Sequence, residues 1–320
     1  MNTLPDAARI LAPPDDQSAA SARWRLALAT AVFLLLPITP ARAATILFVG
    51  NSFTAGGRAS VPEIFDRLAQ AGGHPNPETA MRTQGGADFK FHADDPTTLQ
   101  AIASRPWDFV VLQNFSTEPT HFTADGHRVE NHFTYGSILY ERILANHPGT
   151  KVVLFETWSR AAVHPYITGS SGPNSFASTA EMQGELRANY HALARNLTAG
   201  HPGKPPVSVA PIGTAWEMAG ALAGSTDPDF VDLHGTDDYH ADDDGDYLSA
   251  AVLYSKIYGV SPAGLSRDPL ISELGLQRNV SASYLEDIAW QAALAAPEPG
   301  TAISAFVGAS LLLSSRRRRG

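Results

Sequence analysis

Short apolar runs alternate with longer amphipathic segments between residues 44 and 296. Thr45–Val49, Asp108–Leu112 and Lys151–Phe155 are almost wholly apolar, which is the pattern of parallel strands buried on both faces. Weaker runs predict two further strands, at 79–83 and 206–210. The sequence therefore predicts a sheet of buried parallel strands.

The segments between these runs have helical spacing. Ser60 and Glu63 form a capping box, and apolar residues then recur three and four positions apart until Gly72. Strands that alternate with helices indicate an α/β fold with helices on both faces of the sheet. We expect the other helices at 96–104, 135–146, 180–197, 245–258 and 284–294, and a long loop rich in Ser, Gly and Pro at 159–179.

Composition narrows the class of protein. The 320 residues are enough for one substantial core, and there is no cysteine, which excludes disulfides, thiolate metal sites and a cysteine nucleophile. The net charge is −9, and the two ends hold eight of the 23 basic residues, so the body is more acidic still. An acidic body argues against nucleic acid as a partner.

Residues 1–43 have the features of a signal peptide with an N-terminal extension. Arg23 and Arg25 precede an apolar stretch from Leu26 to Leu36, and Ala41-Arg42-Ala43 is a small-residue cleavage site. The alternative is a membrane anchor, for which the stretch is short. We therefore expect export to the periplasm, the cell surface or the exterior.

Residues 297–320 combine three features in order. Pro297-Glu298-Pro299 precedes an apolar run, Thr301–Leu313, and the arginines 316–319 follow it. This end resembles the PEP-CTERM sorting signal of bacterial exported proteins. The resemblance implies cleavage by an exosortase, transient membrane association and a link to exopolysaccharide. A simple tail anchor is the alternative.

The remaining range, 44–296, is expected to be one domain.

Polar residues and glycines follow the predicted strands. Ser52 follows the first strand, Gly85-Gly86 the second, and Gln113 and Asn114 the third. Ligand sites of parallel sheets lie beyond the carboxyl ends of the strands, so these residues are expected near one another. Ser52 is a candidate nucleophile, although a turn or helix-capping role is commoner for a single serine. The two amides are candidate donors to an oxyanion or to loop carbonyls.

Asp237 and His240 lie on one predicted loop near the end of the domain. An aspartate three residues before a histidine can hold the ring for use as a base. The competing interpretation is a calcium loop, because Asp242, Asp243, Asp244 and Asp246 follow, but they lack the EF-hand spacing.

The order of these signals resembles the SGNH (GDSL-type) hydrolases. Gly50-Asn51-Ser52-Phe53-Thr54 and the later runs are most similar to an uncharacterised bacterial branch of that superfamily. The further runs that carry the resemblance are Gly85-Gly86, Leu112-Gln113, Thr157-Trp158-Ser159-Arg160 and His240 with Gly245-Asp246-Tyr247-Leu248.

This resemblance implies a flavodoxin-like three-layer α/β/α domain. It makes Ser52 the nucleophile, His240 the base and Asp237 its orienting acid, with the N–H groups of Ser52 and Gly86 in the oxyanion hole. The sequence departs from the family at the third block, where Phe115 stands in place of the usual asparagine. Gln113 and Asn114 therefore remain alternative side-chain donors.

We accordingly predict a secreted serine esterase that needs no metal or cofactor. A carbohydrate O-acetyl esterase is the leading interpretation, through the exopolysaccharide link, so the partner would be a small-molecule or polysaccharide ester. A lipase or thioesterase is the second. A non-catalytic polysaccharide-associated protein or an O-acetyltransferase with the same fold is the alternative from another class.

Overall fold

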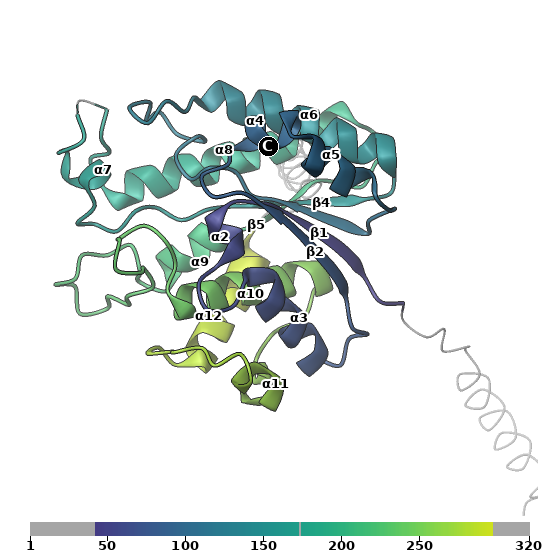
Figure 1. The fold of residues 1–320 in the computed structure, drawn as a ribbon. Helices are drawn as coiled ribbons and strands as arrows, with labels where there is room; N and C mark the ends of the chain where they lie inside the picture. The colour runs from purple at the N-terminus through teal and green to yellow at the C-terminus, as the bar shows by residue number, and fades with distance from the viewer. Residues whose placement is uncertain (1–41, 173, 297–320) are drawn as a thin grey trace, which may run out of the picture. The chain divides into compact units, whose positions relative to one another are not determined.

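Five parallel strands form the centre of the described part of the chain, residues 42–172 and 174–296 of a computed structural model (Figure 1). Their order is β2-β1-β3-β4-β5, as in flavodoxin-like sheets. The chain leaves β1 for β2 on one side and later pairs β3 on the other, so the carboxyl end of β1 is the switch point. The strands are β1 (Thr45–Gly50), β2 (Glu78–Thr83), β3 (Phe109–Leu112), β4 (Lys151–Phe155) and β5 (Ser208–Ala210).

Alternating residues of each central strand enter two separate apolar cores. Ile46 and Phe48 of β1 point into one core, and Leu47 and Val49 point into the other. All four side chains are buried, which explains why the run lacks an apolar–polar alternation. The uniform hydrophobicity of the run thus reflects a sheet that is covered twice.

Each core is closed by its own layer of helices (Figure 1). The α/β three-layer fold with a parallel sheet is therefore confirmed. One layer contains α3 (Val61–Ala71), α9 (Ile212–Met218), α10 (Asp243–Tyr258), α11 (Pro269–Ser272) and α12 (Ala282–Ala295), and the other contains α4 (Phe89–Asp94), α5 (Pro96–Ala103), α6 (Val129–Asn146) and α8 (Thr179–Gly200).

Several helices differ from the sequence prediction. α6 begins at Val129 rather than 135, because its first turn has no side-chain cap and no apolar periodicity to mark it. The short helices α4 and α9 were not predicted, and α7 (Pro165–Thr168) interrupts the expected loop at 159–179. Two short elements, α2 (Ser52–Ala55) and the 3-10 helix η1 (Leu265–Arg267), complete the fold.

The predicted terminal signals lie almost wholly outside the described residues. This applies to the signal peptide up to residue 41 and to the whole sorting signal at 297–320. Within the described ranges, no helix is both long and apolar enough to cross a membrane.

Candidate active site

Ser52 begins the short helix α2 immediately beyond β1, at the switch point of the sheet. The turn before it is tightly packed. A Cβ at Gly50 would come within 2.4 Å of Thr54 Oγ1 and 2.6 Å of Gln113 Oε1. Glycine is therefore required at position 50 for the chain to place Ser52 at the edge of the sheet.

Both polar atoms of the Asn51 side chain hold this turn in place. Its Oδ1 accepts a hydrogen bond from Phe53 N (3.0 Å) and its Nδ2 donates to Ala87 O (2.9 Å). The second bond ties the turn that bears Ser52 to the loop after β2. The asparagine of the Gly-Asn-Ser run thus sets the spacing between Ser52 and the nearby Gly86.

Ser52, His240 and Asp237 form one hydrogen-bonded array. Ser52 Oγ lies 2.8 Å from His240 Nε2, and His240 Nδ1 lies 2.7 Å from Asp237 Oδ2. Asp237 Oδ1 accepts the backbone N–H groups of Tyr239 (3.1 Å) and His240 (2.9 Å). The structure therefore brings together the three residues that the sequence singled out, across 188 positions of chain.

The electrostatics of the loop favour an ionised Asp237. Partial burial on its own would raise the pKa of Asp237, but the hydrogen bonds from His240 and Tyr239 outweigh it and hold the pKa below its usual value. Next to it, Asp238 has φ 58°, the one non-glycine residue with positive φ in the described chain. An ionised Asp237 fixes the tautomer of His240 with a proton on Nδ1 and leaves Nε2 free to accept one from Ser52.

The loop after β4 supports the loop that contains Asp237 and His240. Trp158 Nε1 donates to Tyr239 O (3.2 Å), and Ala161 N donates to Asp238 O (3.1 Å). Trp158 also stacks between Phe53 and Trp216, with 4.2 Å between ring centroids on each side. Trp158 is therefore a buried support for both Ser52 and His240, rather than part of the pocket lining.

The guanidinium of Arg160 packs against the same loop. Its guanidinium lies 3.8 Å from the centre of the Tyr239 ring, and the side chain is almost fully buried. Burial lowers the pKa of Arg160 to about 10, while Tyr239, Asp125 and Asp237 favour the charged form. The sequence contained this arginine in the Thr-Trp-Ser-Arg run but gave it no role.

Two backbone N–H groups of the site have no hydrogen-bond acceptor among the described residues. Ser52 N and Gly86 N donate no hydrogen bond to any other described residue. Gly86 has φ +72°, and no atom lies within 4 Å of the position where a Cβ would stand. The predicted backbone donors are therefore available, and the glycine gives the left-handed turn that exposes the second one.

The two candidate amide side chains do not serve this role, which corrects the prediction. Gln113 is fully buried, its Oε1 accepts from Asn51 N (2.8 Å) and Thr54 Oγ1 (3.0 Å), and its Nε2 donates to Asn114 O. Asn114 is also fully buried, between Phe89 N, Phe115 N and His132 Nδ1. Both amides hold the turns together because the buried backbone there needs partners.

A small pocket of about 280 Å³ opens beside Ser52 and His240. Gly56, Gly57 and Asp246 form part of its wall. Asp246 Oδ2 accepts from Gly57 N (2.8 Å), whereas its buried Oδ1 has no hydrogen-bond partner among the described residues. Burial raises the pKa of Asp246 to about 8, which favours the protonated carboxyl near neutral pH at the edge of the site. The sequence pattern assigned this residue no role beside Ser52.

Two other histidines, His92 and His234, also follow strands or lie near the Asp237 loop, and both have structural roles. His92 is buried under Gly50, with Nε2 2.9 Å from Gly50 O, and burial lowers its pKa to about 4. His234 Nε2 lies 3.0 Å from Ser159 O, away from Ser52. These two histidines hold loops in place.

The aspartates at 242–246 do not converge on one point. Asp242 caps α10, Asp243 and Asp244 accept backbone N–H groups of residues 277–280, and Asp246 accepts Gly57 N. Each carboxylate therefore has a separate backbone partner, and the calcium interpretation finds no support in this part of the structure.

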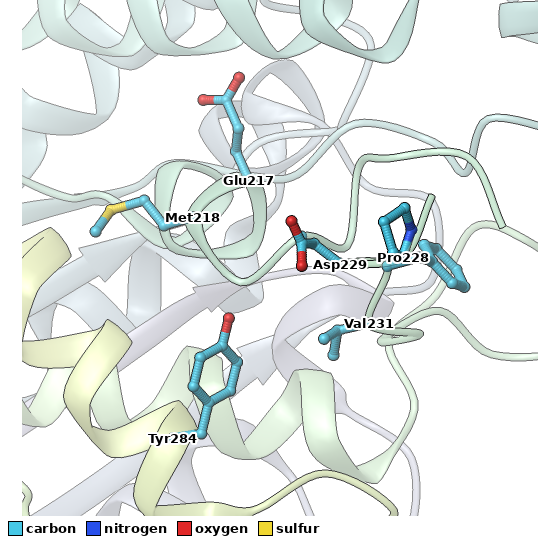
Figure 2. A pocket seen from close by; sticks show the side chains of 8 residues that line it. Glu217, Met218, Pro228, Asp229, Val231 and Tyr284 are labelled. Carbon is cyan, nitrogen blue, oxygen red and sulfur yellow. The ribbon is translucent and has the colours of Figure 1, made fainter. Parts of the chain in front are cut away.

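A larger cavity of about 560 Å³ lies elsewhere (Figure 2). It is bounded by the end of α9, the loop at 228–231 and Tyr284 of α12. None of the residues of the Ser52 array lines it. Of these two cavities, only the smaller one is lined by Ser52 and His240, and it is therefore the candidate active site.

Comparisons with known proteins support the fold. No protein-family model matches the chain, and no curated protein matches it in sequence. Similar solved structures include a DUF4886 family protein from Bacteroides uniformis, with a TM-score of 0.53 and 15% identity over 79% of this chain and 96% of that one.

Two further similar structures have lower scores. They are a putative GDSL-like lipase from Parabacteroides merdae (TM-score 0.49, 17% identity, 69% of this chain and 98% of that one) and a carbohydrate esterase family 3 protein from Talaromyces cellulolyticus (0.45, 15%, 68% and 97%). At these identities the comparison with the Bacteroides protein supports a shared fold, and the function must be argued from the site.

Proposed function

We propose that this chain is a serine esterase that hydrolyses ester bonds through an acyl-Ser52 intermediate. The observation that carries the proposal is the array in which His240 bridges Ser52 Oγ (2.8 Å) and Asp237 Oδ2 (2.7 Å). A serine hydroxyl is a weak nucleophile until an adjacent base takes its proton, and both distances are within the range that proton transfer needs.

In the first half-reaction, Ser52 Oγ attacks the ester carbonyl carbon while its proton passes to His240 Nε2. The negative charge that develops on the carbonyl oxygen is held by the N–H groups of Ser52 and Gly86. Each such donor contributes about 3 kcal/mol to the stability of the transition state. The imidazolium of His240, held by Asp237, then protonates the leaving alcohol as the C–O bond breaks.

In the second half-reaction, water enters beside His240. His240 takes a proton from the water, the resulting hydroxide attacks the acyl carbon, and the proton returns to Ser52 Oγ as the acid is released. Asp237 stays ionised throughout, which agrees with its lowered pKa.

The pocket supports a short acyl or alcohol group. Its volume of about 280 Å³ is just below the range of about 300–1,000 Å³ that is common for ligand sites. Small residues, Gly56, Gly57 and Ala241, form much of its wall. We therefore favour acetyl esters over long-chain lipid esters.

A carbohydrate O-acetyl esterase working outside the inner membrane is the specific form of this proposal. Its support is the resemblance of residues 297–320 to a PEP-CTERM signal, together with the signal-peptide pattern before residue 44. In this form an exosortase processes the chain, and the substrate is an acetylated exopolysaccharide.

The test uses the purified full-length chain and its Ser52→Ala variant with p-nitrophenyl acetate. We expect kcat/KM to fall by at least about 10⁴-fold in the variant, as for removal of a catalytic serine elsewhere. Thermal unfolding of both proteins checks that the fold is intact. Retained turnover in a folded Ser52→Ala protein would sink the proposal.

Three further measurements separate the rival functions. Ser52 should react with a fluorophosphonate probe, and failure to react would favour a non-catalytic protein. Faster turnover of octanoyl or palmitoyl esters than of acetate would indicate a lipase or thioesterase. With acetylated polysaccharide, free acetate indicates hydrolysis, whereas acetyl transfer to an added sugar indicates an O-acetyltransferase.

A further inference from the structure

A cluster of two carboxylates and one histidine lies in the loops that follow β2 and β3. Asp88 follows Gly86 by two residues, in the loop after β2, and Glu118 and His127 belong to the loop between β3 and α6. His127 Nδ1 lies 3.6 Å from Asp88 Oδ2 and 3.8 Å from Glu118 Oε1. One ligand atom from each residue lies within 4.8 Å of the other two.

Glu118 is the unusual member of this cluster. Its side chain is fully buried, and neither carboxylate oxygen accepts a hydrogen bond from a described residue. Removing a carboxylate from water is strongly unfavourable unless partners replace the solvent. Because Glu118 Oε1 is directed at His127, the missing partner belongs between these side chains.

The spacing of the three atoms fits a shared metal ion better than hydrogen bonds. Separations of 3.6 and 3.8 Å exceed the range of an N–H···O hydrogen bond. Ligands bound to one ion at about 2.0–2.2 Å in tetrahedral geometry lie about 3.4 Å apart. The two distances from His127 Nδ1, 3.6 and 3.8 Å, are close to this value, and all three ligand atoms lie within 4.8 Å of one another.

The cluster is also held in place from outside. The His127 ring stacks on Phe115, with 4.0 Å between ring centroids and 14° between planes. Asp88 Oδ1 accepts Phe91 N (2.6 Å), which leaves Oδ2 for the cluster, and His127 N donates to Asp125 Oδ1 (3.1 Å). Such supporting contacts are typical of ligands whose orientation is fixed before an ion binds.

We propose that Asp88, Glu118 and His127 bind one divalent first-row transition metal ion, which joins the loop after β2 to the loop after β3. Two carboxylate oxygens and one imidazole nitrogen suit Zn²⁺ or Mn²⁺ better than Ca²⁺ or Mg²⁺, which prefer oxygen alone. Since Gly86 lies two residues before Asp88, the ion would stiffen the strip of backbone that bears the proposed oxyanion donor. The ion takes no part in the proposed ester chemistry.

The experiment measures binding without turnover, so its failure is distinguishable from failure of the proposed esterase. Untagged full-length protein is stripped with a chelator and titrated with Zn²⁺, Mn²⁺, Ca²⁺ or Mg²⁺ by calorimetry and thermal unfolding. We expect one site per chain for Zn²⁺ or Mn²⁺. At about 100 times Kd the midpoint should rise by about 5–10 °C.

Glu118→Gln removes a charged ligand while keeping the shape of the side chain, and it should weaken binding by at least about 10-fold. Glu185→Gln is the matched control, because Glu185, His121 and Glu181 are the other group of possible metal ligands among the described residues, and Glu185 already pairs with His121 at 2.7 Å. Its binding should equal that of the unchanged protein. If Glu118→Gln fails to fold, His127→Gln provides the same comparison.

Two results would overturn the proposal. One is the absence of heat and of any thermal shift with all four ions, which would leave His127 as an imidazolium paired with two carboxylates. The other is an ion that binds equally well to the unchanged, Glu118→Gln and His127→Gln proteins, since its site would then lie elsewhere.

Discussion

His240 and His127 both occupy loops near the carboxyl ends of the strands, and each has aspartate or glutamate beside it. Hydrogen bonds of 2.7 and 2.8 Å join His240 to an exposed carboxylate and a serine. His127 instead lies 3.6 and 3.8 Å from two carboxylates, one of them fully buried. The same residue types thus form the proposed proton-transfer array at hydrogen-bond distance and the proposed metal-ligand set at longer distances.

The comparison is tested most strongly at His240. His240→Ala removes the only base within reach of Ser52 among the described residues, so kcat for p-nitrophenyl acetate should fall by about 10⁵–10⁶-fold. His121→Ala, at an exposed histidine of the described chain, is the control and should retain full activity. An active His240→Ala protein would show that another group activates Ser52.

Asp237→Asn should have the next largest effect. The amide can still accept from the backbone but no longer stabilises the imidazolium or its tautomer, so kcat should fall by about 10⁴-fold. The thermal midpoint should stay close to that of the unchanged protein, because the Asp237 side chain is half exposed. A decrease below tenfold would mean that the histidine is oriented by other contacts, such as its packing on Tyr239.

Gln113→Ala tests whether the buried amide holds the nucleophile turn. The change leaves Asn51 N and Thr54 Oγ1 without their acceptor, and the free energy of unfolding should drop by about 2–4 kcal/mol. Denaturant unfolding measures this loss, with Gln100→Ala on the exposed side of α5 as the control. If stability is unchanged while activity is lost, Gln113 acts on the substrate after all.

Asp246→Asn should have the smallest effect on activity, and its effect on stability should depend on pH. Burial raises the pKa of Asp246 to about 8, so the folded state binds a proton that the unfolded chain releases near its usual value of 3.8. Its contribution to stability is therefore lost as pH rises from about 4 to 8. Because an amide does not titrate, the midpoint of the variant should rise relative to that of the unchanged protein between pH 5 and pH 8. A difference that does not vary with pH would refute the neutral carboxyl.

The sequence was sufficient to predict the centre of the sheet because the three central strands, β1, β3 and β4, are buried on both faces, whereas the edge strand β2 has no buried residue. Runs such as Thr45–Val49 are apolar throughout, and the tight turn at Gly50 follows directly. The short helices α4 and α9 were missed because a helix of two turns has too few apolar repeats to be recognised. The predictable elements were therefore the strands with a continuous apolar run and the helices long enough to repeat their apolar positions.

Within the site, the residues predicted most clearly are those with a fixed local spacing. Asp237 and His240 share a loop, and Ser52 directly follows a strand. The role of Gln113 was misjudged because an amide can face a substrate or a buried turn, and only the packing decides between them. The proposed metal ligands come from separate parts of the chain, so no local sequence motif predicts them; they are Asp88, Glu118 and His127.

The separation of Ser52 from His240 by 188 positions makes reactivity a property of the completed fold. Ser52 precedes four of the five strands and His240 follows all of them, and contacts between residues so far apart in the chain slow folding. A nascent or unfolded chain would therefore contain Ser52 without an activating base. The fraction of chains that a fluorophosphonate labels would then serve as a covalent count of molecules in which β1 and the His240 loop have met.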